Sequence, residues 1–468
     1  MKLAYQQLAN EQEAALLKDL ADLIAIDSVR DMSKATAEYP VGPGPVKALD
    51  KFLALAQRDG FAVENLDNYA GTISWGTGEE ELGIAIHVDV VPPDLGWQSD
   101  PFKMTIKNGR VYGRGSSDNK GPALACYYAA LALKKAGFVP RKKITFIIGT
   151  DEETDWVGMK YYLQKRPAPT WLFSPDSSFP LVNGQAGLAV LKTTFTRAQS
   201  PAAPLKLVSF KSGQATNMVP ASATATIAGS GLSEVKERFG TFLAQAGLSG
   251  KAILKQGQLD LSLEGAAAHA SIPFEGKNGG SFLAKFLKDL AFEGRDLDFL
   301  TFAGDKDFED YYGEKIGIAN TDPQMGRSIN CPGVFFYEGA EGYIKSDIRY
   351  SRGSSPEKMC TQLNANWGSF SKTDFQPYED FEKPHYVPED DPFVQKLLAV
   401  YRKQTGDCSK PIVSAGANYG RFFKNGLGFG PAFPGSLDCA HAINESVAIA
   451  DLIKSMAIYM ECIYEICQ

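Results

Sequence analysis

Three apolar stretches of strand length, separated by segments of helical pattern, constrain the fold of this chain more than any other feature. They span residues 84–90, 143–149 and 171–173. In the first stretch apolar residues alternate with small or polar ones, so His87 and Asp89 point to the same face of a strand. Strands that alternate with helices favour a mostly parallel sheet covered by helices. The sequence therefore predicts an α/β domain.

Side chains that can hold a metal follow each of these strands. His87 lies at the end of the first, Glu153 follows the second and Asp176 follows the third. Ligands collect at the carboxyl ends of parallel strands, so we expect these groups to lie close together. Asp118 joins them just before a predicted helix at 122–135, where the helix dipole favours an ionised carboxylate.

Apolar residues that recur at intervals of three and four predict amphipathic helices along both ends of the chain. These helices are expected at residues 12–26, 46–56, 122–135 and 445–466. Their apolar faces would cover the predicted sheet, as an α/β domain requires.

The middle of the chain has a different pattern. A chain of 468 residues exceeds one compact core, so two or more folding units are expected. Strand-like and helical pieces mix between residues 186 and 382, as in an α+β domain. Asn217-Met-Val-Pro220 faintly resembles Asn330-Cys-Pro-Gly333, which suggests two similar halves. We expect residues 1–185 and 383–468 to form the α/β domain and residues 186–382 to form an inserted domain.

Composition excludes several classes of partner. A net charge of -7 without a basic block argues against a nucleic-acid binder. No run approaches the roughly 18 apolar residues of a membrane helix, and the N-terminal residues lack the apolar core of a signal peptide. Seven cysteines without a CxxC pair are typical of reduced thiols. We therefore expect a cytoplasmic protein without nucleic-acid or membrane partners.

The candidate ligands suit a pair of divalent ions. The chain has four histidines, two of which join three acidic residues in the expected set: His87, Asp118, Glu153, Asp176 and His441. Two imidazoles and three carboxylates favour zinc, with cobalt or manganese as substitutes. Two ions about 3.5 to 4 Å apart can share a carboxylate and a water that ionises near neutral pH. The adjacent Glu152 and Glu153 can then divide metal binding and general base catalysis between them.

Five short motifs, in this order, resemble the di-zinc metallopeptidase superfamily of aminoacylases, succinyl-diaminopimelate desuccinylases and glutamate carboxypeptidases. The similarity extends over essentially the whole chain, including the long insertion of the bacterial dipeptidases in that superfamily. The motifs are His87-Val-Asp89, Gly113-Arg-Gly-Ser-Ser-Asp-Asn-Lys-Gly121, Asp151-Glu-Glu153, Pro175-Asp176 and His441-Ala-Ile-Asn-Glu445.

This resemblance implies a role for each residue of the set. Asp118 would bridge the two metals, with His87 and Asp176 completing one site. Glu153 and His441 would complete the other. Glu152 would be the general base, with a purely supporting acid as its alternative, and Asp89 would support His87.

The insertion resembles the lid of that superfamily. The resemblance implies that His269 stabilises the oxyanion, while Asn217, Arg349 and the backbone of Gly416 hold substrate. A guanidinium can bind a free carboxylate through two parallel hydrogen bonds, which fits Arg349. A salt bridge within the lid, a turn at Asn217 and a structural role for His269 are the alternatives. A doubled lid also implies a monomer.

Together these features predict a zinc dipeptidase that hydrolyses unblocked dipeptides by attack of a metal-bridging hydroxide. An N-acyl-amino-acid deacylase with the same di-zinc centre is the alternative enzyme, and a non-catalytic binding protein is the alternative outside catalysis. Asn119 replaces a second aspartate that the superfamily often has, and residues 435–440 before His441 are atypical. Substrate preference therefore stays open.

Overall fold

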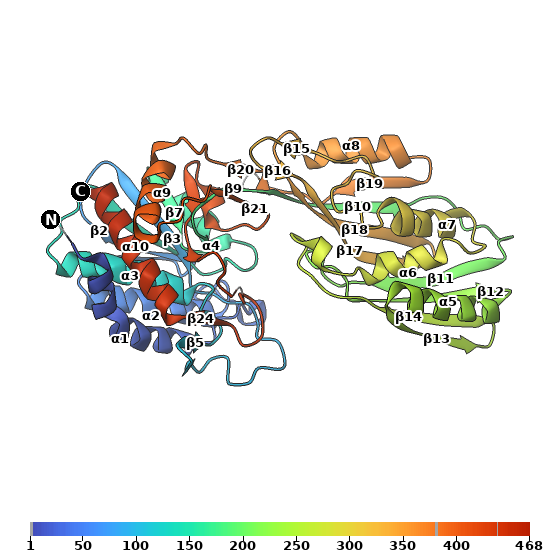
Figure 1. The fold of residues 1–468 in the computed structure, drawn as a ribbon, viewed down its shortest axis with the longest axis horizontal. Coiled ribbons are helices and arrows are strands. Elements are labelled where there is room, and N and C mark those ends of the chain that lie inside the picture. Colours follow the sequence, from blue (N-terminus) through green and yellow to red (C-terminus); the bar gives the residue numbers. More distant parts are fainter. Residues whose placement is uncertain (1–2, 380–381, 438) are drawn as a thin grey trace. The chain divides into compact units, whose positions relative to one another are not determined.

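The computed structural model describes residues 3–379, 382–437 and 439–468. It divides into two compact units. Unit 1 comprises Met1–Gly184 and Tyr386–Gln468, and unit 2 comprises Gln185–His385. Unit 2 is thus inserted into the sequence of unit 1 (Figure 1).

A nine-stranded sheet forms the centre of unit 1. The order along its main path is β1 (Ala62–Leu66), β2 (Ala70–Trp75), β6 (Lys143–Gly149), β3 (Glu81–His87), β7 (Trp171–Ser174), β22 (Gly426–Gly428), β9 (Val182–Gln185) and β20 (His385–Tyr386), and β21 (Ile412–Ser414) pairs with β9. The central strands β6, β3, β7 and β22 run parallel, whereas β1 and β2 add an antiparallel edge. The predicted α/β fold with a mostly parallel sheet is confirmed.

The helices of unit 1 pack on both faces of this sheet because its strands are apolar on both sides. Ile84 and Ile86 belong to the larger core, whereas Ala85 belongs to a smaller one on the opposite face with Met159 and Tyr419. The larger core includes buried residues of α1 (Tyr5–Ile24), α2 (Pro43–Arg58), α3 (Lys120–Lys135), α9 (Pro392–Thr405) and α10 (Ile449–Cys467). The smaller core includes α4 (Val157–Lys165) and a 3-10 turn at Tyr419–Phe422.

Two predicted helix starts were wrong. The first helix begins at Tyr5 rather than at residue 12, because its polar first turns still pack Ala9 into the core. The last helix begins at Ile449 rather than at residue 445, because Ser446–Ala448 form strand β24 instead. β24 pairs with β5 (Arg110–Tyr112), which in turn pairs with β4 (Thr105–Lys107).

Small strand pairs bring distant loops together at one edge of unit 1. β23 (Pro431–Ala432) pairs with β8 (Ser177–Ser178), directly after β7. The backbone N–H of Gly113 donates to the carbonyl of Glu445 at 3.1 Å. The loop that precedes α3 therefore lies beside the segment between β23 and β24.

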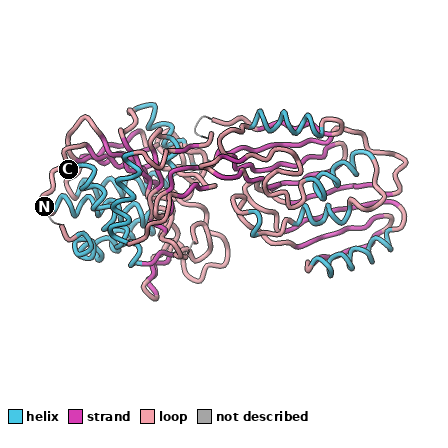
Figure 2. The backbone as a smooth tube through the Cα atoms, turned by 45° about the horizontal axis from the view of Figure 1, so that its top comes forward, coloured by secondary structure: helices cyan, strands magenta, loops and turns pink. Residues whose placement is uncertain are grey.

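Unit 2 is an α+β unit built on an eight-stranded antiparallel sheet. Its order is β13 (Ser249–Lys255), β14 (Gln258–Glu264), β12 (Ser222–Gly229), β11 (Leu205–Ser212), β17 (Ile329–Glu338), β18 (Glu341–Tyr350), β10 (Gly187–Phe195) and β19 (Ser371–Phe375). The helices α5 (Leu232–Ala246), α6 (Gly279–Leu287), α7 (Gly294–Thr301) and α8 (Pro356–Trp367) pack against these strands. Figure 2 shows the long strands with the helices beside them.

One apolar core joins this sheet and its helices, with Phe210, Phe299 and Tyr337 at its centre. Short elements complete the chain: the strand pair β15 (Thr321–Asp322) and β16 (Gly326–Arg327), 3-10 turns at Met32–Lys34 and Pro273–Glu275, and a π-helical turn at Phe302–Lys306. None of the described helices combines the length and the apolar character that a membrane crossing needs.

Candidate metal centre

The carboxyl ends of three neighbouring parallel strands carry the predicted ligands of unit 1. His87 is the last residue of β3, Glu153 lies four residues after the end of β6, and Asp176 lies two residues after β7. Asp118 precedes the first turn of α3 by two residues, and His441 comes from the loop between β23 and β24. Five separate segments of unit 1 therefore supply the set.

Asp118 lies at the centre of this group, with one oxygen toward each imidazole. Its Oδ1 is 3.0 Å from Nε2 of His87, and its Oδ2 is 3.0 Å from Nε2 of His441. The ring of His87 also lies 3.7 Å from Oδ2 of Asp176, and the ring of His441 lies 2.9 Å from Oε2 of Glu153. This arrangement has the connectivity that two ions sharing one carboxylate would need.

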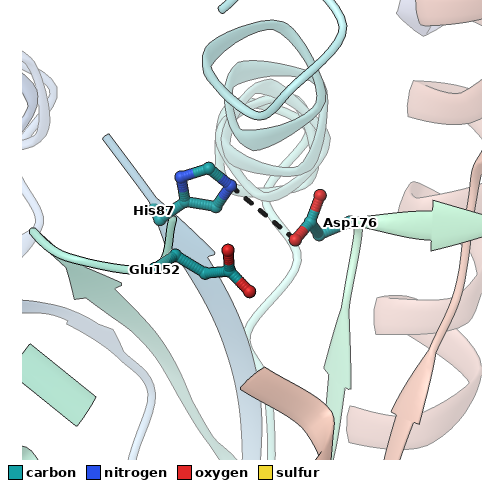
Figure 3. A group of neighbouring side chains, drawn as sticks. All are labelled: His87, Glu152 and Asp176. Carbon is teal, nitrogen blue, oxygen red and sulfur yellow. Dashed lines mark ion pairs between the residues drawn. The ribbon is translucent and has the colours of Figure 1, made fainter. Parts of the chain in front are cut away.

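Glu152 turns toward the same space. His87, Glu152 and Asp176 form one group whose possible ligand atoms all lie within 4.8 Å of one another, and His87, Asp118 and Glu153 form a second. Figure 3 shows the carboxylate of Glu152 beside the ion pair of His87 and Asp176. Glu152 is thus placed either to bind a metal or to exchange a proton with a group held there.

Buried oxygens without partners support a cation at this position. Oε1 of Glu152 and Oε1 of Glu153 are both buried and have no hydrogen-bond partner among the described residues. Buried polar atoms in proteins are nearly always paired, and a carboxylate oxygen is a good ligand for a divalent ion. The donor set of two imidazoles and several carboxylates therefore fits a pair of such ions.

The charged side chains of the centre shift one another's pKa values. Hydrogen bonds to Asp118 and then to Glu153 raise the pKa of His441 to about 11. Burial opposes protonation of His87, but its contacts with Asp118 and Asp89 outweigh burial and hold its pKa well above the ordinary value. Protons on the two imidazoles thus supply the positive charge that the surrounding carboxylates require.

The acidic side chains of the centre respond in two ways. Burial would raise the pKa of Asp118, yet hydrogen bonds from His441 and His87 keep it far below its usual range. Burial, followed by the charge of Asp118, raises the pKa of Asp176 to about 8 and that of Glu153 to about 7. Burial, with the charge of Asp176, also raises the pKa of Glu152 well above its ordinary value. A carboxyl group with such a pKa suits proton transfer near neutral pH.

Asp89 orients two members of the set. Nδ1 of His87 lies 3.1 Å from the carbonyl oxygen of Asp89, so this nitrogen carries the proton and Nε2 faces Asp118 when the ring is neutral. Oδ2 of Asp89 accepts the backbone N–H of Glu153 at 3.1 Å. Such outer contacts fix the direction in which a ligand presents its lone pair.

Glu445 is a supporting residue that the sequence did not reveal. Its fully buried carboxylate accepts a hydrogen bond from the guanidinium of Arg114 at 2.9 Å and from the backbone N–H groups of Gly115, Ser117 and Asp118 at 2.8 to 3.1 Å. The carboxylate therefore fixes the loop that presents Asp118. The motif His441-Ala-Ile-Asn-Glu445 contained the residue, but only the fold shows what Glu445 contacts.

The variant residue Asn119 has a related role. Its side-chain amide donates to the carbonyl oxygen of Pro175 at 2.9 Å and to Oδ1 of Asp176 at 3.3 Å. Asn119 thus contacts a candidate ligand without belonging to the set. Cys439 is not in the set either, because its thiol donates to the carbonyl oxygen of Ser446 at 3.0 Å. Asp438, in the atypical segment before His441, lies outside the described residues.

Four of the five candidate ligands, together with Glu152, line one cavity within unit 1. Its volume is about 470 Å³, and its lining includes Asp118, Glu152, Glu153, Asp176 and His441. Gly416 also lines it, and the backbone N–H of Gly416 donates to Oγ of Ser414 at 2.9 Å. The predicted backbone contact at Gly416 therefore lies on the wall of the cavity that holds the centre.

The remaining predicted residues belong to unit 2. Asn217 and His269 are exposed and lie on neighbouring segments, because Met218 and His269 form a backbone bridge. Nδ1 of His269 is 2.7 Å from Oγ of Ser271. Arg349, on β18, is buried and donates from Nε and Nη2 to the two oxygens of Asp347 at 2.6 and 3.1 Å. This guanidinium is already engaged in an ion pair within unit 2.

Comparison with known proteins assigns the chain to a family. The model of peptidase family M20/M25/M40 matches residues 83–465. The chain belongs to this peptidase family. The M20 match begins just before His87 and ends in the last helix. It therefore includes all five candidate ligands, from His87 at the end of β3 to His441 near the C-terminus.

Curated relatives of this M20 peptidase carry dipeptidase names. The chain is 47% identical to a Beta-Ala-Xaa dipeptidase of Lactobacillus delbrueckii subsp. lactis over 100% of this chain and 99% of that relative. It is 36% identical to a putative dipeptidase of Staphylococcus haemolyticus (strain JCSC1435), with 99% of each chain covered. These relatives support dipeptidase activity in the M20 peptidase.

Solved structures show the same fold at low sequence identity. Human carnosine dipeptidase 1 is 14% identical and matches with a TM-score of 0.59 over 98% of both chains. A Bacillus subtilis protein described as a dinuclear metal binding peptidase from the M20 family is 9% identical, with a TM-score of 0.52 over 98% of this chain and 99% of that one. Family and relatives together identify the chain as a metallopeptidase.

Proposed function

We propose that this M20 metallopeptidase is a di-zinc dipeptidase that hydrolyses unblocked dipeptides. The observation that carries the proposal is the meeting of two imidazoles and four carboxylates, from five segments of unit 1, in one group whose members other than His87 line a single cavity. Asp118 would serve both ions, and the other ligands would divide into two pairs. They are His87 with Asp176 and Glu153 with His441. Cobalt or manganese would be acceptable substitutes for zinc.

The metals and the side chains would have separate tasks. A pair of bound zinc ions would polarise the scissile carbonyl and make a water acidic enough to ionise near neutral pH. Glu152 would take the proton of the attacking water on its carboxylate and deliver that proton to the leaving nitrogen. The buried Oε1 of Glu152, which has no hydrogen-bond partner among the described residues, supports this role.

Residues outside the metal centre would bind the rest of the substrate. We propose that His269 of unit 2 donates to the oxyanion, where a donor is most effective at the moment charge develops. Asn217 and Arg349 would hold the substrate, with the guanidinium of Arg349 on its free carboxylate, and Gly416 would contact the substrate through its own backbone. The ion pair of Arg349 with Asp347 supports an oriented guanidinium rather than a mobile one.

The cysteines bear on the cellular setting of the enzyme. All seven cysteines are free, as is typical of proteins in reducing compartments. We therefore propose a cytoplasmic enzyme. The two similar halves that the sequence predicts in the insertion favour a monomer.

A substrate panel tests the reaction. The zinc-loaded protein is expected to hydrolyse Ala-Ala and β-Ala-Ala with kcat/KM at least about tenfold above that for Ala-Ala-Ala or N-acetyl-Ala. One buried polar group left without its partner lowers kcat/KM by about this factor. Product amino acids would be quantified by chromatography. Preference for N-acetyl-Ala would instead identify a deacylase, and tight dipeptide binding without products would identify a binding protein.

Metal binding should depend on pH in a way that ordinary histidines do not produce. Only neutral imidazole binds a metal, so a proton on His441, whose pKa is raised to about 11, competes with zinc throughout the range from pH 6 to 9. We expect the apparent zinc affinity to rise about tenfold or more per pH unit across this range. A competing chelator of known affinity would measure it at each pH. Unperturbed histidines, with a pKa of about 6.5, would give an affinity that levels off above pH 7. That result would contradict the raised pKa of His441.

A further inference from the structure

The cavity of the candidate metal centre has a carboxylate in its wall that lies outside the centre itself. Asp451 is the third residue of α10, and it lines the same 470 Å³ cavity as Asp118 and His441. Its side chain is half-buried, and its Oδ2 accepts a hydrogen bond from Oγ of Ser436 at 3.1 Å. The dipole of α10 favours a negative charge at this position.

Asp451 differs from the other acidic residues of the cavity. Among the described residues that line it, the acidic ones are Asp118, Glu152, Glu153, Asp176 and Asp451. The first four belong to the candidate centre, where they contact its histidines or one another. Asp451 belongs to neither metal group. It is therefore a charge of the cavity that the chemistry proposed for the centre does not use.

The cations near Asp451 are engaged elsewhere. Arg110, which also lines the cavity, donates from Nε to Oγ of Ser446 at 3.1 Å and from Nη2 to the carbonyl oxygen of Ser446 at 2.9 Å. The ammonium of Lys454 lies over the ring of Phe433, 4.4 Å from its centroid. Within the described part of the chain, the hydroxyl of Ser436 is the partner of Asp451. Its carboxylate is thus free to accept a cation from the cavity.

Apolar residues share the cavity wall with this carboxylate. Phe433, Leu437 and Val447 line the cavity together with Asp451. A ligand that fits such a wall has a short aliphatic part and a positively charged end with several N–H donors. The N-terminal residue of an unblocked dipeptide has this chemistry, whereas the acyl group of an N-acyl-amino acid lacks the charge.

We propose that Asp451 binds the primary ammonium group of the substrate's N-terminal residue and so selects free dipeptides over N-acyl-amino acids. This inference rests on the proposed dipeptidase function and names a specificity residue for it. The ammonium donates to the carboxylate, and a hydrogen bond between two charged groups is stronger and shorter than a neutral one. Ser436 holds the carboxylate in position.

The test compares two ligands that differ only in the amine. β-Ala-Ala and propionyl-Ala have the same carbon chain, and only the first carries an ammonium group. In Asp451→Asn we expect the KM for β-Ala-Ala to rise about 10- to 100-fold, as the loss of a hydrogen bond to a charged group predicts. The inhibition constant of propionyl-Ala against β-Ala-Ala hydrolysis should stay within about twofold. Equal effects on both ligands, or no effect on either, would overturn the proposal.

Two further variants separate recognition from structure. Asp451→Glu keeps the charge and should recover part of the preference for β-Ala-Ala. Ser436→Ala removes the hydrogen bond to Asp451 but keeps its carboxylate, so it should preserve most of the preference. If Ser436→Ala abolishes the preference as fully as Asp451→Asn does, the role is structural and the proposal fails. Zinc content must remain at the wild-type level in all three variants. If the wild-type protein cleaves neither ligand, the proposed dipeptidase function is refuted instead.

Discussion

Glu152→Gln is expected to lower kcat for dipeptide hydrolysis by about 10²- to 10⁴-fold, the range that general acid–base groups typically contribute. Glutamine has nearly the same shape as glutamate, but it cannot take a proton from water and return it to the leaving nitrogen. Because the proposed ligands are other residues, bound zinc should stay at the wild-type ratio. Steady-state kinetics and elemental analysis of the same sample would measure both quantities.

A nearby acid provides the control for this experiment. Asp155 lies in the same turn, but its side chain is 64% exposed and pairs with Arg30. Asp155→Asn should therefore keep nearly full activity. If Glu152→Gln loses zinc in proportion to activity, Glu152 is a ligand, as its place beside His87 and Asp176 also allows. Wild-type kcat in Glu152→Gln would exclude it from the reaction.

Asp118→Ala is expected to have the second large effect, on metal binding itself. This carboxylate contacts both imidazoles, and we propose that it contacts both ions. Changes to residues that merely support ligands lower metal affinity about 10- to 100-fold, so removal of a shared ligand should exceed that range. Zinc content after dialysis should fall, and dipeptide hydrolysis should fall with it.

The matched control is Asp94→Ala, an exposed aspartate in the loop after β3. It should retain zinc and activity. Circular dichroism would establish that Asp118→Ala still folds, because the variant removes the 3.0 Å partner of Nε2 of the buried His87 and leaves this nitrogen the 3.7 Å contact with Asp176. A folded Asp118→Ala protein with full zinc content would show that the ions bind elsewhere.

The sheet, and the strand ends at which the candidate ligands lie, could be predicted from the sequence because both depend on local patterns. Alternation along residues 84–87 places Ile84 and Ile86 in one core and Ala85 in the other, as a strand between two helical layers requires. Parallel strand ends then bring their following residues to one edge. The pattern therefore predicts that His87 and Asp176 lie at the same edge of the sheet, where the structure places them.

Contacts between distant segments could not be predicted in the same way. The carboxylate of Glu445 meets the loop before α3, and Asp451 lines the cavity from the first turn of a helix whose start was misplaced. Glu445 and Asp451 reach the site only because the small strands β23 and β24 pair with β8 and β5. Arg349 was expected to bind substrate, but its pairing with Asp347 depends on side-chain geometry along β18 that the alternation alone does not give.

The tie between Asp118 and Glu445 has a consequence for biosynthesis. These residues are 327 positions apart, and the whole of unit 2 is translated between them. A ribosome-bound chain that has completed the first strands and even the insertion still lacks His441 and the carboxylate that steadies the Asp118 loop. Such a nascent chain cannot assemble the proposed metal centre, so we expect activity to begin only after the last segment of unit 1 has emerged and folded back.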